Sequence, residues 1–170
     1  MEEEFLPPLP ACITDILRAT KLCYLATSED HAPHLSLMNF SFMNDEEYGN
    51  VLVMSTRRNT KKFEALVKNP KVAILIHDFD CKRSEFESRV TTSSSSPATP
   101  AASPGTFSVT VYGEVLVASG ERAEALRSNH LLINPDYRQF ILGEEIAILV
   151  FQPNFARMCN INDTVSMWCK

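Results

Sequence analysis

The sequence has no long hydrophobic run, and no stretch approaches the roughly 20 consecutive apolar residues that a membrane-spanning helix requires. Its first residues, Met-Glu-Glu-Glu, are acidic and are followed closely by Pro7, Pro8 and Pro10. This is the wrong composition for a signal peptide or a mitochondrial presequence. We therefore expect a soluble protein of the cytoplasm or the nucleus.

Basic residues are too few for a partner with many negative charges. The 170 residues include 16 lysines and arginines against 21 aspartates and glutamates, which gives a formal net charge of -5. Proteins that bind nucleic acid or anionic membranes usually present a large basic surface. The charge therefore predicts no nucleic-acid partner and no membrane partner, and it fits a small anionic ligand better.

Cysteine is sparse, and the common catalytic motifs are absent. The five cysteines are scattered, without a CxxC pair and without histidines at a spacing that binds zinc. They indicate free thiols in a reducing compartment and no metal site. The sequence also lacks a GxSxG, P-loop or HExxH motif. These motifs are the usual sequence evidence for hydrolases and nucleotide triphosphatases, so neither function is indicated. No side chain is identified as a catalytic acid or base.

One segment that is present combines four cations with four small polar residues: residues 55–62, Ser-Thr-Arg-Arg-Asn-Thr-Lys-Lys. An apolar run at 51–54 precedes it and helical spacing at 63–67 follows, which predicts a turn from a strand into a helix. The first N–H groups of a helix have no partner within it and the helix dipole is positive there, so a phosphate is favoured. The alternative is a solvated basic helix start.

Hydrophobic periodicity predicts strands interspersed with short helices. Thr14 or Asp15 is available to cap the first helix, and Asn69-Pro70 and Gly143 mark the ends of later ones. The predicted helices lie at 11–20, 63–67, 121–131 and just before Gly143, and the predicted strands at 22–27, 34–43, 51–55, 72–77, 106–118 and 146–151.

Residues 81–105 differ in composition from the rest of the chain. They are rich in serine, threonine and proline, with almost no apolar side chain after Val90. Because the segment separates two strands of one predicted sheet, we expect a low-complexity surface loop within a single domain of residues 1–170. Its hydroxyl groups permit phosphorylation, although a passive spacer is the simpler interpretation.

The order of the predicted elements favours a mainly β fold of the α+β class. Short strands with mainly antiparallel neighbours are typical of a closed or half-closed barrel with helices packed outside. A generic α+β domain is the alternative.

Three segments together resemble a known family: 32–39 (Ala-Pro-His-Leu-Ser-Leu-Met-Asn), 53–56 with Thr60-Lys61-Lys62, and 69–75 (Asn-Pro-Lys-Val-Ala-Ile-Leu). They look like the FMN-binding split barrel of the pyridoxamine 5'-phosphate oxidase-like superfamily, and more closely like its fungal members. The match runs from about residue 11 to about residue 118, with 81–105 inserted. It implies an antiparallel split β-barrel, FMN as the cofactor and a homodimer with each flavin at the subunit interface.

The resemblance also implies roles for individual residues. Lys61 and Lys62 correspond to the basic pair that holds the FMN phosphate, with Thr60 before them and Arg58 as a second phosphate contact. The other implied cofactor-binding residues are His34, Ser36, Leu37, Met38 and Asn39 along the flavin, Ser55 and Thr56 beside the ribityl chain, Ser108 near the ring, and Trp168 reaching the flavin of the partner subunit.

These roles lead to a flavin-dependent oxidoreductase that acts on an unknown small substrate. Oxidation of vitamin B6 is not expected, because the segment around Trp168 lacks the arginine of the substrate-phosphate site. Two alternatives stay open. One is a flavin-binding module without turnover, serving as a sensor or carrier, and the other is a split barrel that binds haem or a deazaflavin.

Overall fold

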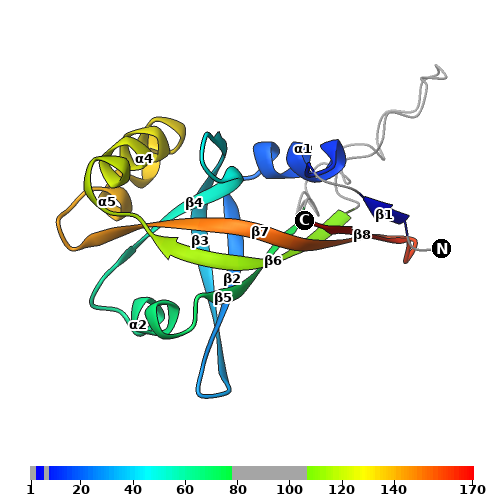
Figure 1. The fold of residues 1–170 in the computed structure, drawn as a ribbon, viewed down its shortest axis with the longest axis horizontal. Coiled ribbons are helices and arrows are strands. Elements are labelled where there is room, and N and C mark those ends of the chain that lie inside the picture. The colour runs from blue at the N-terminus through cyan, green and yellow to red at the C-terminus, as the bar shows by residue number, and fades with distance from the viewer. Residues whose placement is uncertain (1–2, 6–7, 78–106) are drawn as a thin grey trace, which may run out of the picture.

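The computed structural model describes residues 3–5, 8–77 and 107–170. The predicted surface loop at 81–105 lies outside these residues. Within the described part, the chain forms one mostly antiparallel sheet with a few helices around it (Figure 1). The predicted fold class is therefore confirmed.

Eight strands of the described residues belong to this sheet. The six predicted strands correspond to β2 to β7, whereas β1 and β8 were not predicted. Their bounds are β1 (Glu3–Phe5), β2 (Leu22–Glu29), β3 (Ala32–Asp45), β4 (Gly49–Arg57), β5 (Lys71–His77), β6 (Phe107–Val117), β7 (Ile146–Asn160) and β8 (Val165–Cys169).

The sheet closes on itself. Strands β7, β4, β3, β2, β5 and β6 are successive neighbours, and β6 pairs again with β7. All of these pairs are antiparallel. Closure leaves the six strands without a free edge. The predicted barrel is therefore confirmed, and the alternative of a generic α+β domain is excluded. Outside the ring, β8 pairs with β7, and β1 pairs with β8 in parallel.

Strand β7 is long enough to serve several neighbours. Its residues 146–151 pair with β4 and its residues 155–159 with β8, while β6 runs beside it along most of its length. The β6–β7 register shifts between Tyr112 and Gly113. A Cβ atom at Gly113 would lie 2.0 Å from the backbone oxygen of Gln152, so this bulge requires glycine.

The helices pack outside the barrel: α1 (Ala11–Ala19), α2 (Lys61–Lys68), α4 (Gly120–Ile133), the 3-10 helix η1 (Pro135–Tyr137) and α5 (Arg138–Ile141). Helices α4 and α5 lie at one end of the sheet, and β1 and β8 at the other (Figure 1). None of the described helices is both long and apolar enough to cross a membrane.

The start of α1 differs from the prediction. The helix begins at Ala11, directly after Pro10, whose carbonyl accepts hydrogen bonds from the N–H groups of Ile13 and Thr14. The prediction that Thr14 or Asp15 caps it was wrong, because both residues lie inside the helix. The hydroxyl of Thr14 instead donates to the carbonyl of Ala11 at 3.1 Å.

The barrel encloses the main hydrophobic core, and β4 is buried on both faces. Leu52 and Met54 of β4 point into the barrel core, while Val51 and Val53 belong to a second cluster that includes Ala123 of α4. The continuous apolar run of β4 follows from this double burial. Burial on both faces holds β4 in place, and the basic turn follows directly after this strand. Each barrel strand contributes a fully buried side chain: Leu25, Phe40, Met54, Ile74, Val111 and Phe151.

Candidate functional site

The predicted anion-binding turn lies between β4 and α2. Strand β4 ends at Arg57 and α2 begins at Lys61, which confirms the strand-to-helix turn. The hydroxyl oxygen of Thr60 accepts the backbone N–H of Phe63 at 3.3 Å and the hydroxyl donates to the carbonyl of Arg57 at 2.9 Å. Thr60 is therefore an N-cap that shapes the turn, and its hydroxyl hydrogen is already used.

Lys62 is a half-buried cation with a weak partner. Its ammonium nitrogen lies 3.0 Å from the sulfur of Met38, and no carboxylate in the described part of the chain contacts it. Burial lowers the pKa of Lys62, and burial also raises the pKa of the nearby Cys23 thiol to about 12, an effect that Lys62 opposes. A thioether is a poor acceptor for an ammonium group, so Lys62 is available to an anion.

A cavity of about 330 Å³ lies between the strands β3 and β4 and helix α5. We call it the α5 cavity. Seven of the thirteen residues implied by the resemblance line it: Leu37, Met38, Asn39, Ser55, Thr56, Thr60 and Lys62.

The opposite wall of the α5 cavity was missed by the sequence analysis. Tyr137 and Phe140 line it, and the hydroxyl of Ser55 donates to the carbonyl of Phe140 at 2.8 Å. This hydrogen bond ties α5 to the end of β4. Two aromatic residues close together after Asn134-Pro135 were the available signal, but a four-residue helix has no periodicity that would assign them to a site.

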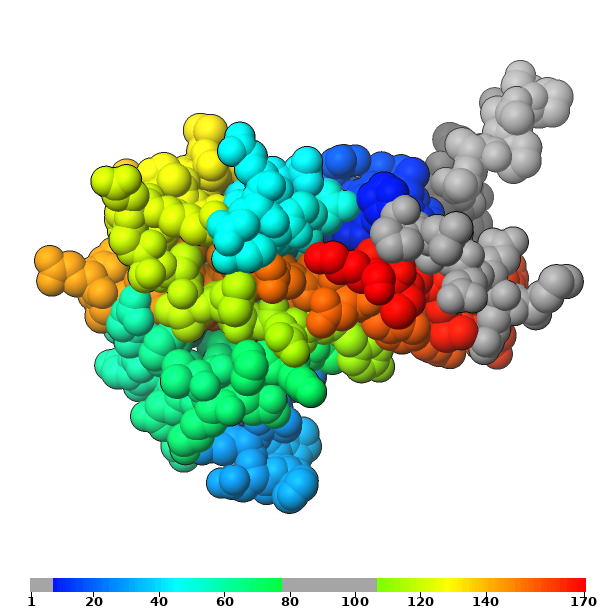
Figure 2. Space-filling model, viewed as in Figure 1, coloured from blue at the N-terminus to red at the C-terminus, as the bar shows by residue number. Residues whose placement is uncertain are grey.

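A second cavity, of about 400 Å³, lies on the other side of Lys62, between α2 and the hairpin that joins β2 to β3. We call it the hairpin cavity. His34, Lys61 and Lys62 line it, as does Thr27. Ser36 lies next to it along β3, with its hydroxyl 3.3 Å from Nδ1 of His34. The hairpin projects at the lower end of the molecule, beside α2 (Figure 2).

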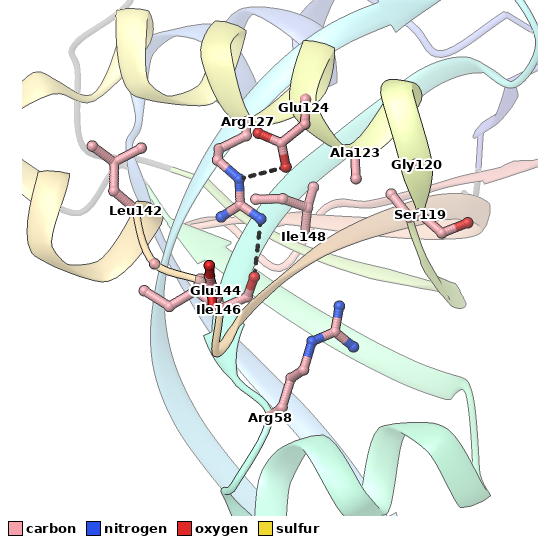
Figure 3. Close-up of a pocket in the computed structure, with 12 residues that line it drawn as sticks. Arg58, Ser119, Gly120, Ala123, Glu124, Arg127, Leu142, Glu144, Ile146 and Ile148 are labelled. Atoms are coloured by element: carbon pink, nitrogen blue, oxygen red, sulfur yellow. Dashed lines mark hydrogen bonds and ion pairs between the residues drawn. The ribbon is translucent and has the colours of Figure 1, made fainter.

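Arg58 faces a different cavity from Lys61 and Lys62. Its guanidinium lies over the ring of Phe63, 5.5 Å from the centroid, and it lines a cavity of about 720 Å³ beside α4 (Figure 3). On the far wall, Arg127 donates to the carbonyls of Ile141 and Ile146 and to the carboxylate of Glu124. Arg127 therefore holds the loop after α5 in place, and three of its five N–H groups are used in doing so.

Ser108 and Trp168 lie away from both cavities at the basic turn. Ser108 stands on β6, opposite His77 of β5 and Cys159 of β7. Trp168 stands on β8, is 3% exposed and packs in the barrel core. The fold of one subunit therefore does not bring these two residues together with the other predicted ones.

A buried polar network supports the wall of the α5 cavity. The side-chain amide of Asn39 donates to the side-chain oxygen of Asn134 at 3.0 Å, and the amide of Asn134 donates to the hydroxyl oxygen of Ser41 at 2.8 Å. Ser41 lies 2.6 Å from Nδ1 of His130. Since the hydroxyl oxygen of Ser41 already accepts from Asn134, we assign its hydrogen to Nδ1. Burial lowers the pKa of His130 to about 4, so the ring is neutral and the network holds Asn39 in place.

The chain is similar over most of its length to known sequences and folds. The pyridoxamine 5'-phosphate oxidase family matches residues 9–131. A protein of Schizosaccharomyces pombe described as a pyridoxamine 5'-phosphate oxidase homolog is 30% identical over 165 residues, which cover 89% of this chain and 85% of that protein.

Solved structures share the fold at lower identity. A heme-binding protein from Mycobacterium smegmatis has a TM-score of 0.66 at 14% identity, over 96% of this chain and 60% of that one. An FAD-binding protein from the same organism has a TM-score of 0.56 at 17% identity, over 90% of this chain and 98% of that one. The three motifs, the closed antiparallel barrel and the family match agree: this chain belongs to the pyridoxamine 5'-phosphate oxidase family of split-barrel proteins.

Proposed function

We propose that this protein binds FMN and works as a flavin-dependent oxidoreductase on a small substrate. The observation that carries the proposal is Lys62, a half-buried cation that has no carboxylate partner among the described residues, at the helix start that borders the α5 cavity. A phosphate supplies the strong acceptor that Lys62 lacks, and the first N–H groups of α2 favour the same charge. The names of the relatives, which include an oxidase homolog and an FAD-binding protein, support a flavin.

The residues present fit a flavin mononucleotide. Lys62 and Lys61 would hold the phosphate, and Ser55 and Thr56 would lie beside the ribityl chain. The isoalloxazine ring would pack in the α5 cavity, whose walls offer apolar and aromatic side chains. When bound, FMN supplies hydride or electron transfer, and the protein supplies position and electrostatics.

Among the described residues that line the α5 cavity there is no histidine, aspartate or glutamate. Its ionisable side chains are Arg57, Lys62 and Tyr137. A substrate that needs a carboxylate or imidazole base therefore fits poorly, and one that exchanges a hydride directly with the flavin fits better. The same absence favours the alternative of a flavin-binding module without turnover. Reduction of the bound flavin by NADH or NADPH, followed as loss of the visible flavin absorbance, separates the two, since only the enzyme is expected to turn over with an acceptor.

A homodimer is part of the proposal. Side chains that point outward from neighbouring strands form an apolar face, and the pairs Tyr24–Leu37, Tyr24–Leu75 and Ala73–Tyr112 are directly opposite one another. Leu35 and Leu37 on this face are 64% and 59% exposed. An apolar patch of this kind marks an interaction surface. Because Leu37 also lines the α5 cavity, a second subunit on this face would cover the flavin.

A cytoplasmic location also remains a proposal. It is supported by Cys23, Cys159 and Cys169 of the described residues, which are free thiols as expected in a reducing compartment.

The central test is a comparison of FMN with riboflavin, which lacks the phosphate, by quenching of flavin fluorescence. Lys62→Ala should weaken FMN binding roughly ten- to hundredfold, because a hydrogen bond to a charged group contributes about 1.5–3 kcal/mol. Riboflavin binding should change less than about twofold. Lys68→Ala is the matched control, since Lys68 lies at the other end of α2 and pairs with Glu29.

Two results would count against the proposal. If neither flavin binds the unmodified protein, it is not a flavoprotein. If Lys62→Ala weakens FMN and riboflavin equally, the phosphate is not held at the turn between β4 and α2.

A further inference from the structure

Two sulfur atoms surround the cation of the candidate site. The ammonium nitrogen of Lys62 lies 3.0 Å from Sδ of Met38, and its charge also acts on the thiol of Cys23, which stands opposite Met38 in the β2–β3 pair. Met38 and Lys62 both line the α5 cavity. A thioether is a weak acceptor, so a group with a stronger acceptor would displace it from Lys62.

Of these two sulfur atoms, the one in Met38 is open to oxidation. Cys23 is 0% exposed, and burial raises the pKa of its thiol to about 12, so almost no reactive thiolate is present at neutral pH. A thioether reacts without losing a proton. The α5 cavity that Met38 lines has a volume of about 330 Å³. A water molecule occupies roughly 30 Å³, so hydrogen peroxide, which has one more oxygen atom, fits into this cavity.

We propose that Met38 is a site of reversible oxidation by hydrogen peroxide, and that its sulfoxide weakens phosphate binding at Lys62. The second part rests on the proposed function. In the reaction, a lone pair of Sδ attacks one oxygen of the peroxide and the O–O bond breaks. The other oxygen leaves as water after taking the proton of the first. The sulfur is oxidised by two electrons, and the peroxide is reduced.

The sulfoxide changes what Lys62 contacts. Oxidation converts an apolar side chain into a polar one, and its new oxygen accepts a charge-assisted hydrogen bond from the ammonium group. This oxygen carries a partial negative charge, so it competes with a phosphate for Lys62 and repels it. Riboflavin has no phosphate, so it loses only packing against the altered side chain. Oxidation should therefore act mainly on FMN.

The test treats the flavin-free full chain with hydrogen peroxide and locates each sulfoxide by peptide mass spectrometry. Sulfoxide should form at Met38 and not at Met54, which is 0% exposed in the barrel core. By fluorescence quenching, FMN affinity should fall about tenfold and riboflavin affinity less than about threefold. Methionine sulfoxide reductases should restore FMN binding. FMN present during the treatment should protect Met38, because it would cover the α5 cavity.

Two variants assign the effect to one sulfur atom. Each is compared with itself before and after peroxide, so its starting affinity does not enter the result. Met38→Leu has nearly the same volume without the sulfur, and its ratio of FMN to riboflavin affinity should not respond to peroxide. Met167→Leu is the matched control and should respond as the unmodified protein does, because Met167 lies on β8, at the other end of the sheet from α5 (Figure 1).

The outcomes separate this inference from the proposed function. If Met38 is not oxidised, or if its sulfoxide lowers FMN and riboflavin affinity equally, the inference is wrong and the proposed function stands. If the untreated protein binds FMN no more tightly than riboflavin, the proposed phosphate site and the second part of the inference are both wrong. Retained riboflavin binding after the treatment shows that the oxidised protein is folded.

Discussion

His130 lies entirely inside the protein, behind the wall of the α5 cavity, and is 0% exposed. Its burial lowers the pKa from 6.5 to about 4. The unfolded chain therefore binds one proton more than the folded protein between these two pH values, and stability falls as the pH falls through this window. A lowering of the pKa from 6.5 to about 4 corresponds to about 3 kcal/mol of stability.

Urea unfolding at pH 7 and at pH 4.5 measures this effect. The free energy of unfolding should be lower at pH 4.5, and His130→Leu should remove that dependence although it destabilises the protein at both values. Hydrogen bonds from Tyr48 and Arg122 lower the pKa of Asp45 in spite of its burial. Asp45 therefore affects stability mainly below its usual pKa of 3.8, which lies outside the pH range compared in this experiment. A slope that persists in His130→Leu would assign the dependence to another group.

Gly113 is required at the β6–β7 bulge because the backbone of β7 occupies the place of a side chain. A methyl group there would lie 2.0 Å from the oxygen of Gln152. Gly113→Ala should therefore destabilise the protein by roughly 3 kcal/mol or more. Gly49→Ala is the control: its Cβ meets nothing within 4 Å and only the φ of +69° is unfavourable, at a cost of about 1 kcal/mol. Equal melting temperatures for the two variants would contradict the bulge geometry.

We expect Phe140 of α5 to contribute to flavin binding without contributing much to stability. Phe140 is 55% exposed and faces the α5 cavity. Phe140→Ala should weaken FMN and riboflavin alike, about tenfold each, since a packed aromatic pair contributes about 1 kcal/mol beyond its buried area. The free energy of unfolding should change by less than about 0.5 kcal/mol. Leu132→Ala, at an exposed position of α4, should leave flavin binding unchanged.

The barrel strands were predictable because their burial follows the apolar pattern. The run Val51 to Met54 was expected to be a buried strand, and its two faces pack against two clusters. The second half of β7 was missed because Pro153 and Asn154 are residues that usually end strands. Pro153 is tolerated because it stands opposite Gly113 at the bulge, where the regular ladder is interrupted.

The basic turn of the candidate site was also predictable, because a strand, a turn and a helix are consecutive in the sequence. The aromatic wall was not. Ser55 and Phe140 are 85 residues apart, and their contact depends on where α4 sets α5 against β4. Strand β8 was missed because a five-residue segment with only Ser166 and Trp168 buried has too few positions to show a period.

At the scale of the whole molecule, the apolar outer face predicts self-association. Leu35→Glu places a charge on that face, at a position that is 64% exposed and so is not needed by the barrel core. The variant should be a monomer, whereas the unmodified protein should be a dimer by analytical ultracentrifugation. Leu132→Glu, at an 80% exposed position of α4, should remain a dimer. An unmodified protein that sediments as a monomer at all concentrations would exclude this interface.

The closure of the ring by β7 has a consequence for how the chain folds. Strands β4 and β6 each pair on one side with β7, which begins at Ile146. The paired residues of β4 and β7 are therefore separated by more than half of the sequence. Such non-local pairing gives a high contact order and slow folding. During synthesis, the open side of β4 has no partner until residues 146–151 have left the ribosome, and the open side of β6 is not fully paired until Asn160 has done so. These two edges are therefore the sites at which a truncated or stalled chain is exposed to aggregation.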